Sequence, residues 1–153
     1  MIKKIVYLIL MLSIGIHQSK AQNPEKELYL ESIGIFSSQN IYLSYVYLGN
    51  LSDGYMYKAL SRNFVEKLIN EQIAFMQESE KQYIKLAESV YFDESGKAIL
   101  QAQAEIMKLI QEQAAEFLKY IESGESKYVE SYEIKRLASW EKISTLLGLE
   151  GQP

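Results

Sequence analysis

The sequence has no cysteine and a single histidine, His17, among its 153 residues. The absence of cysteine excludes disulfides, a thiol nucleophile and lipid attachment through a cysteine. Because His17 lies in a segment that we expect to be removed, the mature chain also lacks the usual general base and the commonest soft metal ligands. No glycine-rich phosphate loop and no Asp-x-Asp-x-Asp-Gly calcium loop is present. We therefore predict a protein that is not an enzyme and has no metal or cofactor.

Proline is nearly absent, since Pro24 and Pro153 are the only two. Proline removes a backbone donor and clashes with the preceding helical turn, so a long stretch without it permits long helices. Apolar residues recur along this stretch at helical spacing, and glycines fall mostly between the periodic segments. We predict an all-α domain with an up-down-up-down four-helix bundle, because short links favour antiparallel neighbours. The predicted helices cover residues 25–48, 53–92, 95–122 and 126–147.

The second predicted helix is unusually long. At about 1.5 Å per residue it would extend about 60 Å, against about 33 Å for the fourth. This mismatch predicts either a break within 53–92 or an overhang that another surface covers. The turn signal at residues 49–54, Gly-Asn-Leu-Ser-Asp-Gly, predicts the start of this helix. The segment 41–48 is rich in β-formers, but we predict helix there because no second strand is available to pair with it.

The predicted core follows one apolar stripe on each helix. On the second helix the stripe is widened by Val65, Ile69, Ile73, Met76 and Tyr83. On the last helix Trp140 is expected to pack in the core, with a cation–π contact to Arg136 as a further option. The main stripes of the second, third and fourth helices are Leu60, Phe64, Leu68, Phe75, Leu86 and Val90; Ile99, Gln103, Ile106, Ile110, Gln113, Phe117 and Tyr120; and Val129, Tyr132, Arg136, Trp140, Ile143 and Leu147.

The N-terminus has the three parts of a secretory signal peptide. Two lysines precede an apolar run over residues 5–16, and the small residues Ser19 and Ala21 follow it. The apolar run has about 12 residues, whereas crossing a bilayer takes about 20. We predict a signal peptide over 1–21, cleaved after Ala21, and a single exported domain over 22–153 in the periplasm or outside the cell. The alternative is an uncleaved N-terminal anchor.

Cleavage would make the chain more acidic. It removes three lysines and no acid, which leaves 13 of the 16 basic residues against 20 acidic ones and a formal net charge of −7. Binding to nucleic acid depends on Lys and Arg that neutralise phosphates, and anionic membranes attract the same residues. We therefore predict no nucleic-acid partner, no preference for anionic membrane surfaces, and no stable membrane span after signal cleavage.

The first predicted helix has no charged residue between Glu31 and Asp53. A helix that is apolar on several sides needs several partners, so it either lies at the bundle centre or forms an interface. Membrane insertion is disfavoured by polar residues such as Ser37 and Asn40 in its middle. Tyrosines also crowd its end, which suits either a binding surface or a cap on the bundle. The candidate interface residues are Ile35, Tyr42, Tyr45, Val46, Tyr47, Tyr55 and Tyr57.

Four amides fall on or beside the apolar stripes, namely Asn40, Gln72, Gln103 and Gln113. Buried amides can fix the register between helices, and they can also line a small polar pocket inside a bundle. The functional hypothesis that follows is a non-enzymatic bundle that binds protein, either itself or an envelope partner. The alternative is a carrier or sensor of a small apolar or aromatic ligand held between the helices.

Overall fold

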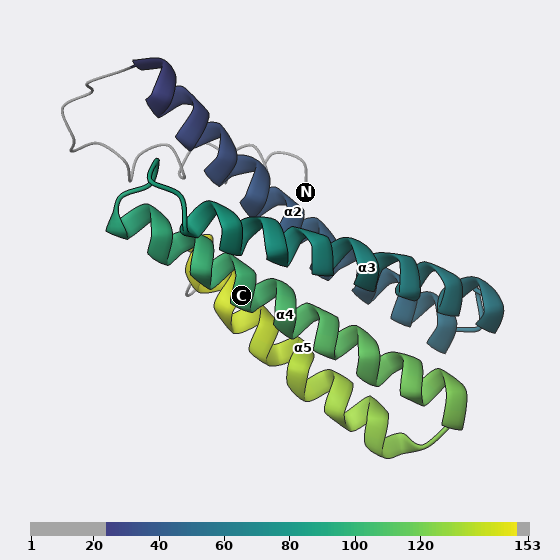
Figure 1. Ribbon diagram of the computed structural model, residues 1–153. Coiled ribbons are helices and arrows are strands. Elements are labelled where there is room, and N and C mark those ends of the chain that lie inside the picture. The colour runs from purple at the N-terminus through teal and green to yellow at the C-terminus, as the bar shows by residue number, and fades with distance from the viewer. Residues whose placement is uncertain (1–23, 150–153) are drawn as a thin grey trace.

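The computed structural model describes residues 24–149, and over this range the chain forms four helices and no strand (Figure 1). The predicted all-α, four-helix architecture is confirmed. The predicted signal peptide over 1–21 lies outside the described residues. The helices are α2 (Pro24–Met56), α3 (Arg62–Ala87), α4 (Glu94–Ser123) and α5 (Ser126–Leu146).

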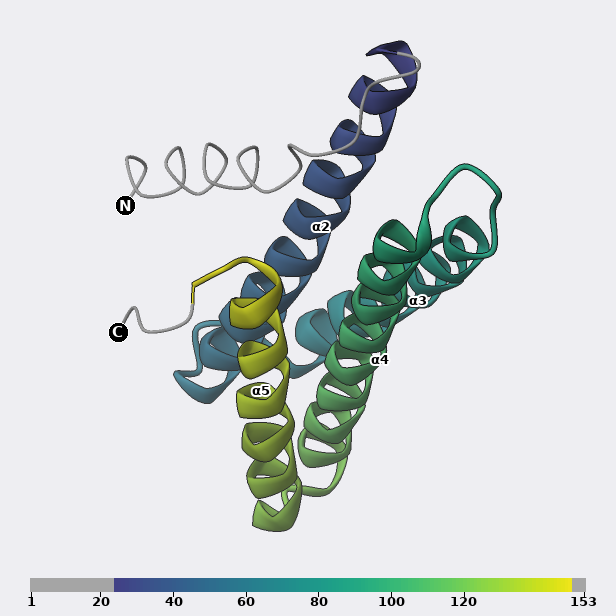
Figure 2. The same ribbon diagram turned by 90° about the vertical axis from the view of Figure 1, so that its left-hand side faces the viewer.

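Helices that follow one another in the sequence run in opposite directions (Figures 1 and 2). Side-chain hydrogen bonds connect neighbours around the bundle: Gln111 on α4 donates to Glu80 on α3 at 2.7 Å. The hydroxyls of Ser52 on α2 and Tyr132 on α5 lie 2.7 Å apart in the interior. The largest fully buried apolar side chains come from all four helices, and they are Ile41, Leu48, Val65, Ile69, Met76, Ile106, Met107, Ile110, Phe117 and Ile143.

The link between α2 and α3 does not lie where the sequence predicts it. Helix α2 continues through the expected turn at 49–54 and ends at Met56. Leu51 and Ser52 are buried, so packing against the other helices stabilises helical backbone through a segment whose local signals favour a turn. The chain turns instead at residues 57–61, where Lys58 has a left-handed φ of 59°.

The predicted long second helix over 53–92 is therefore wrong at both ends. Its first residues belong to α2, while α3 begins at Arg62 and ends at Ala87. Residues 88–93 form the link to α4, and Val90 in this link is 91% exposed rather than part of the core. Of the two explanations offered for the excess length, a break is the one that the structure shows. The buried residues of α3 are Val65, Ile69, Met76, Tyr83 and Ala87. The first four were predicted only to widen the main apolar stripe of this helix.

Helices α4 and α5 begin and end within two residues of their predicted limits. Asp93 caps α4, because its carboxylate accepts a hydrogen bond from the backbone N–H of Gly96 at 2.8 Å. Gly124 ends the helix with a φ of 72°, a conformation that costs glycine little. The expected core series of α4 is buried from Gln103 to Phe117, but Ile99 is exposed near the end of the bundle.

The buried face of α2 is formed largely by serine. Ser37, Ser38, Ser44 and Ser52 are all buried, between the apolar residues Ile41, Leu48 and Leu51. Residues 24–36 include no buried residue, and this part of α2 diverges from the other helices (Figure 2). The uncharged helix is thus neither fully central nor fully exposed.

Candidate functional site

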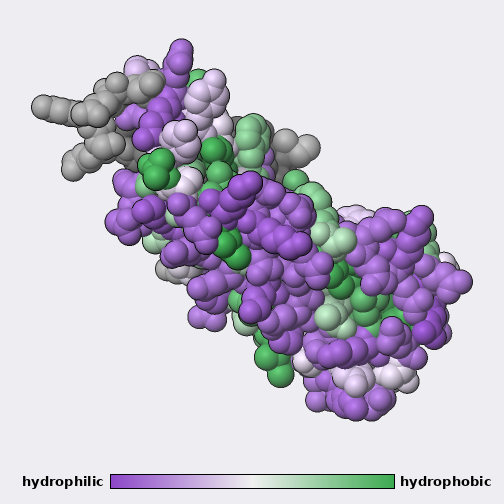
Figure 3. All heavy atoms as spheres, in the orientation of Figure 1, coloured by the Kyte–Doolittle hydropathy of each residue, from purple (hydrophilic) through white to green (hydrophobic). Residues whose placement is uncertain are grey.

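The outer face of α2 exposes a row of large apolar side chains. Tyr29 and Phe36 are each 67% exposed, Leu43 is 62% exposed and Tyr47 is 38% exposed. Their spacing of seven, seven and four residues places them on one face of the helix. Hydrophobic residues are visible over the N-terminal part of α2, among the hydrophilic residues that cover most of this view (Figure 3). We call these four residues the α2 stripe.

Helix α3 extends this surface. On α2, Asn40 lies between Phe36 and Leu43, and its amide donates to the hydroxyl of Ser79 on α3 at 3.1 Å. Phe75 lies one helical turn before Ser79, so it occupies the side of α3 nearest α2. Its side chain is 52% exposed. Phe75 thus adds an exposed aromatic side chain on the side of α3 that faces α2.

The predicted interface residues are distributed over several parts of the bundle. Tyr47 and Tyr57 are exposed, and Tyr47 belongs to the α2 stripe. Ile35, Tyr42 and Val46 are half-buried. Tyr45 and Tyr55 are also half-buried, and like Tyr42 they pack against the buried core. The seven residues thus do not form one continuous exposed surface.

Tyr45 is half-buried and packs against α5. Its ring stacks on the ring of Trp140, with centroids 5.6 Å apart. Trp140 is itself 37% exposed, so the expected core position of this tryptophan is only partly met. Arg136 forms no cation–π contact with Trp140 within the described residues, and its guanidinium donates to Glu133 at 2.7 Å. Tyr45 and Trp140 together close the seam between α2 and α5.

The candidate interface residues predicted from the sequence did not include Phe36 and Leu43, which are among the most exposed apolar residues of α2. The helical spacing grouped both with Tyr29 and Tyr47 on one face, but the pattern gave no reason to prefer that face for exposure. The four buried serines were the available signal, because they mark the opposite side of α2 as the one that other helices approach. Serine at a buried helix contact is less common than an apolar residue, which is why this signal is weak.

The four predicted amides lie in different environments. Gln103 and Gln113 are completely buried on α4, whereas Asn40 and Gln72 are half-buried. Asn40 donates to Ser79 and also to the hydroxyl of Tyr83 at 3.0 Å. Gln103 reaches Ser38 only at 3.4 Å, and its carbonyl oxygen has no partner among the described residues.

Gln113 lies beside the buried pair of Ser52 and Tyr132. Its amide is close enough to lower the pKa of the Tyr132 phenol in part, although burial raises that pKa overall. Neither polar atom of the Gln113 amide makes a hydrogen bond of acceptable geometry within the described part of the chain. The amides therefore do not converge on one polar pocket: Asn40 joins α2 to α3, and Gln113 lies near the contact between α2 and α5.

Alkaline pH is expected to destabilise the fold through its buried tyrosines. Burial raises the pKa of Tyr83 and of Tyr132, whereas in the unfolded chain both phenols have a pKa of about 10. Between the unfolded-state and folded-state pKa values of each tyrosine, the folded state binds more protons than the unfolded state. The free energy of unfolding is therefore unchanged below pH about 10. Above that pH it falls, by up to about 1.4 kcal/mol per pH unit for each tyrosine. Urea unfolding across this range measures the slope.

The Tyr132→Phe variant should show a shallower alkaline slope than the wild type, because one of the buried titrating phenols is gone. Tyr57→Phe is the matched control, since Tyr57 is 83% exposed. An identical slope in Tyr132→Phe and the wild type would contradict the assignment of this pH dependence to the buried phenol.

The charged residues form ion pairs on the surface of the bundle. Lys135 and Lys142 on α5 pair with Glu112 and Glu105 on α4, at 2.7 and 3.2 Å. Pairs of this exposure contribute about 0–1 kcal/mol each and mainly fix the registration of the two helices.

Within residues 24–149 no group of three or more acidic, histidine or cysteine side chains is placed to hold a metal ion. None of the described helices has the length and apolar character needed to cross a membrane.

Comparison with known protein families, curated proteins and solved structures finds no match to this chain.

Proposed function

We propose that this protein is an exported, non-enzymatic helical bundle that self-associates through the α2 stripe. The observation that carries the proposal is the exposure of Tyr29, Phe36 and Leu43 on a helix that has no charge from residue 32 to residue 52. Exposed apolar patches on soluble proteins mark interaction surfaces. The basic start, short apolar run and small residues of the N-terminus support export with cleavage after Ala21.

The size of the apolar surface supports a protein partner. If a whole aromatic side chain has about 200 Å², Tyr29, Phe36, Tyr47 and Phe75 together expose about 450 Å². Leu43 of the α2 stripe, which is 62% exposed, adds to this area. A standard protein interface buries about 800 Å² on each partner, and polar residues supply its rim. The surface is thus large enough to form the apolar centre of such an interface.

The charge pattern of α2 supports a second copy in antiparallel orientation. Glu25, Glu27 and Glu31 lie at the N-terminal end of the helix. A parallel copy would bring these acids next to the same acids of its partner, and like charges in close proximity destabilise an interface. An antiparallel copy, related by a two-fold axis near the middle of the α2 stripe, places them opposite the uncharged part of the partner's helix.

Size-exclusion chromatography with light scattering, over a concentration series, tests the proposal on the chain that begins at Gln22. We expect a dimer for the wild type and dissociation of that dimer in Leu43→Glu, with an increase in Kd of about 30-fold or more, because a charge in the centre of an apolar interface costs at least as much as a hot-spot truncation.

Leu137→Glu is the matched control. Leu137 on α5 is also 62% exposed, so the substitution introduces the same charge at an equally accessible leucine outside the α2 stripe. Its Kd should equal that of the wild type. A wild-type chain that stays monomeric throughout, or a dimer that survives Leu43→Glu but not Leu137→Glu, would show that the α2 stripe is not a self-association surface.

A further inference from the structure

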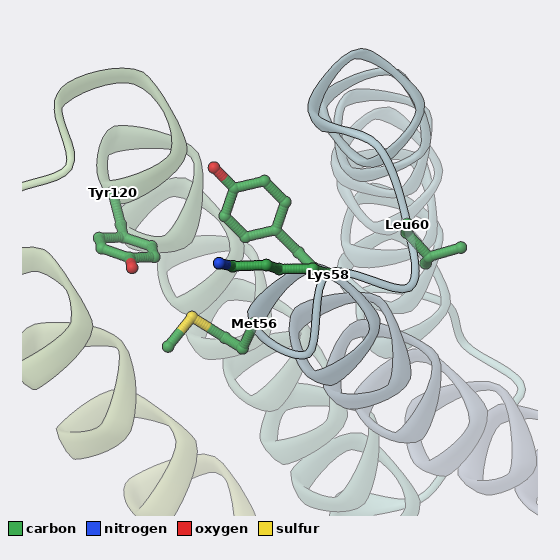
Figure 4. Close-up of a pocket in the computed structure, with 5 residues that line it drawn as sticks. Met56, Lys58, Leu60 and Tyr120 are labelled. Carbon is green, nitrogen blue, oxygen red and sulfur yellow. The ribbon is translucent and has the colours of Figure 1, made fainter.

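A small cavity lies at the opposite end of α2 from the divergent segment, where the chain turns into α3. It has a volume of about 310 Å³ and is lined by Tyr55, Met56, Lys58, Leu60 and Tyr120. This volume is at the lower end of the range of small-molecule sites. Figure 4 shows the Lys58 side chain extending from the turn towards Tyr120, with the Met56 thioether on the same side.

Lys58 occupies a backbone conformation that normally favours glycine. Its φ of 59° follows the end of α2, the position at which a left-handed glycine commonly ends a helix. A residue with a Cβ is strained there, and such strain recurs at functional sites. A lysine also complements the negative end of a helix, but that effect extends over the last turn and does not require this strained position.

The ammonium group of Lys58 has no carboxylate partner among the described residues. The nearest cation along the chain is already neutralised, because Arg62 donates to Glu66 at 2.6 Å. Lys58 is therefore the charged group of the cavity that remains available to an anion.

The aromatic wall of the cavity is held in place from behind. The ring of Tyr55 meets the rings of Phe117 and Tyr120 edge-on, with centroids 5.9 and 6.3 Å apart. Phe117 is completely buried in the core. A site whose walls are fixed before binding loses less entropy when a ligand enters.

From this arrangement we infer that the cavity binds a small arylalkanoate, a carboxylate joined by a short chain to an aromatic ring. Lys58 would pair with the carboxylate, and the hydroxyls of Tyr55 and Tyr120 can donate to it. The aromatic ring would pack against the tyrosine rings and the Met56 thioether. This site lies at the end of the bundle rather than between helix interiors, and it does not depend on self-association through the α2 stripe.

Calorimetric titration with phenylpropanoate, and with the uncharged phenylpropanamide as matched ligand, tests the inference. We expect the acid to bind the wild type about 10-fold or more tightly than the amide, as one charge-assisted hydrogen bond implies. Lys58→Gly should weaken binding of the acid by the same factor and leave binding of the amide unchanged. Because glycine relieves the left-handed strain, this variant should melt no lower than the wild type, so its loss of binding cannot be due to unfolding.

Lys85→Met controls for the loss of one positive charge, since Lys85 is an exposed lysine near the other end of α3. It should bind phenylpropanoate as the wild type does. Equal affinity of the wild type for acid and amide, no binding of either, or unchanged binding of the acid in Lys58→Gly would overturn the inference.

Discussion

Phe117→Ala is expected to lower the free energy of unfolding by about 3–5 kcal/mol, the cost usual for removing a buried phenylalanine. Phe117 is 1% exposed and lies where α2, α4 and α5 meet. Its ring contacts those of Tyr55, Tyr120 and Tyr132, with centroids 5.9, 5.9 and 5.1 Å apart. Three rigid rings cannot collapse easily into the space that the substitution leaves, so we expect the upper part of this range. For a domain of ordinary stability this is a large fraction of the total.

Urea unfolding followed by circular dichroism measures this effect. Phe64→Ala is the matched control, because Phe64 on α3 is 49% exposed and alanine is a good helix former. We expect a loss of less than about 1 kcal/mol for the control. Similar losses for the two variants would mean that Phe117 is not at the centre of the core. Phe117→Ala should also weaken phenylpropanoate binding, since it removes the support behind Tyr55.

Gln113→Leu is expected to raise the free energy of unfolding by about 1–3 kcal/mol, because a buried polar group without a good hydrogen bond destabilises the folded state by about that amount. The Gln113 side chain is 0% exposed and neither of its polar atoms is satisfied within residues 24–149. Leucine is close to it in size and removes both atoms. The neighbouring hydroxyls of Ser52 and Tyr132 keep each other as partners at 2.7 Å.

The same exchange at Gln72 provides the comparison. Gln72 is half-buried on α3, so its amide can reach solvent, and we expect Gln72→Leu to change the stability by less than about 0.5 kcal/mol. Thermal and urea unfolding of both variants, with light scattering, measure stability and oligomeric state together. A less stable Gln113→Leu would show that the amide is well hydrogen-bonded. A changed oligomeric state would show that it fixes the arrangement of the helices.

Local signals in the sequence were reliable where they agreed with the tertiary structure. Asp93 and Gly124 mark the two ends of α4. The Asp93 carboxylate caps the first turn, and Gly124 ends the helix because glycine accepts a left-handed φ. The buried series from Gln103 to Phe117 could be recognised because α4 has neighbours along one continuous side. In such a helix the spacing of apolar residues and the buried face coincide.

The same kind of signal misled at the end of α2. The segment 49–54 contains two glycines, an asparagine and an aspartate, yet it is helical because Leu51 and Ser52 are buried against the other helices. The true turn contains Lys58 in a left-handed conformation, which no local pattern predicts for lysine. The limits of α2 and α3 could not be obtained without knowing which residues the bundle buries.

The sequence by itself determined the class of this protein. The lack of proline between Pro24 and Pro153 and the apolar spacing led to four helices, because these are properties of each segment alone. Only the tertiary structure decided which side of α2 is buried. That helix has no charge for 21 residues, so its pattern could not distinguish one face from another. Phe36 and Leu43 are exposed because the three other helices cover one side of α2 and leave its outer face to solvent.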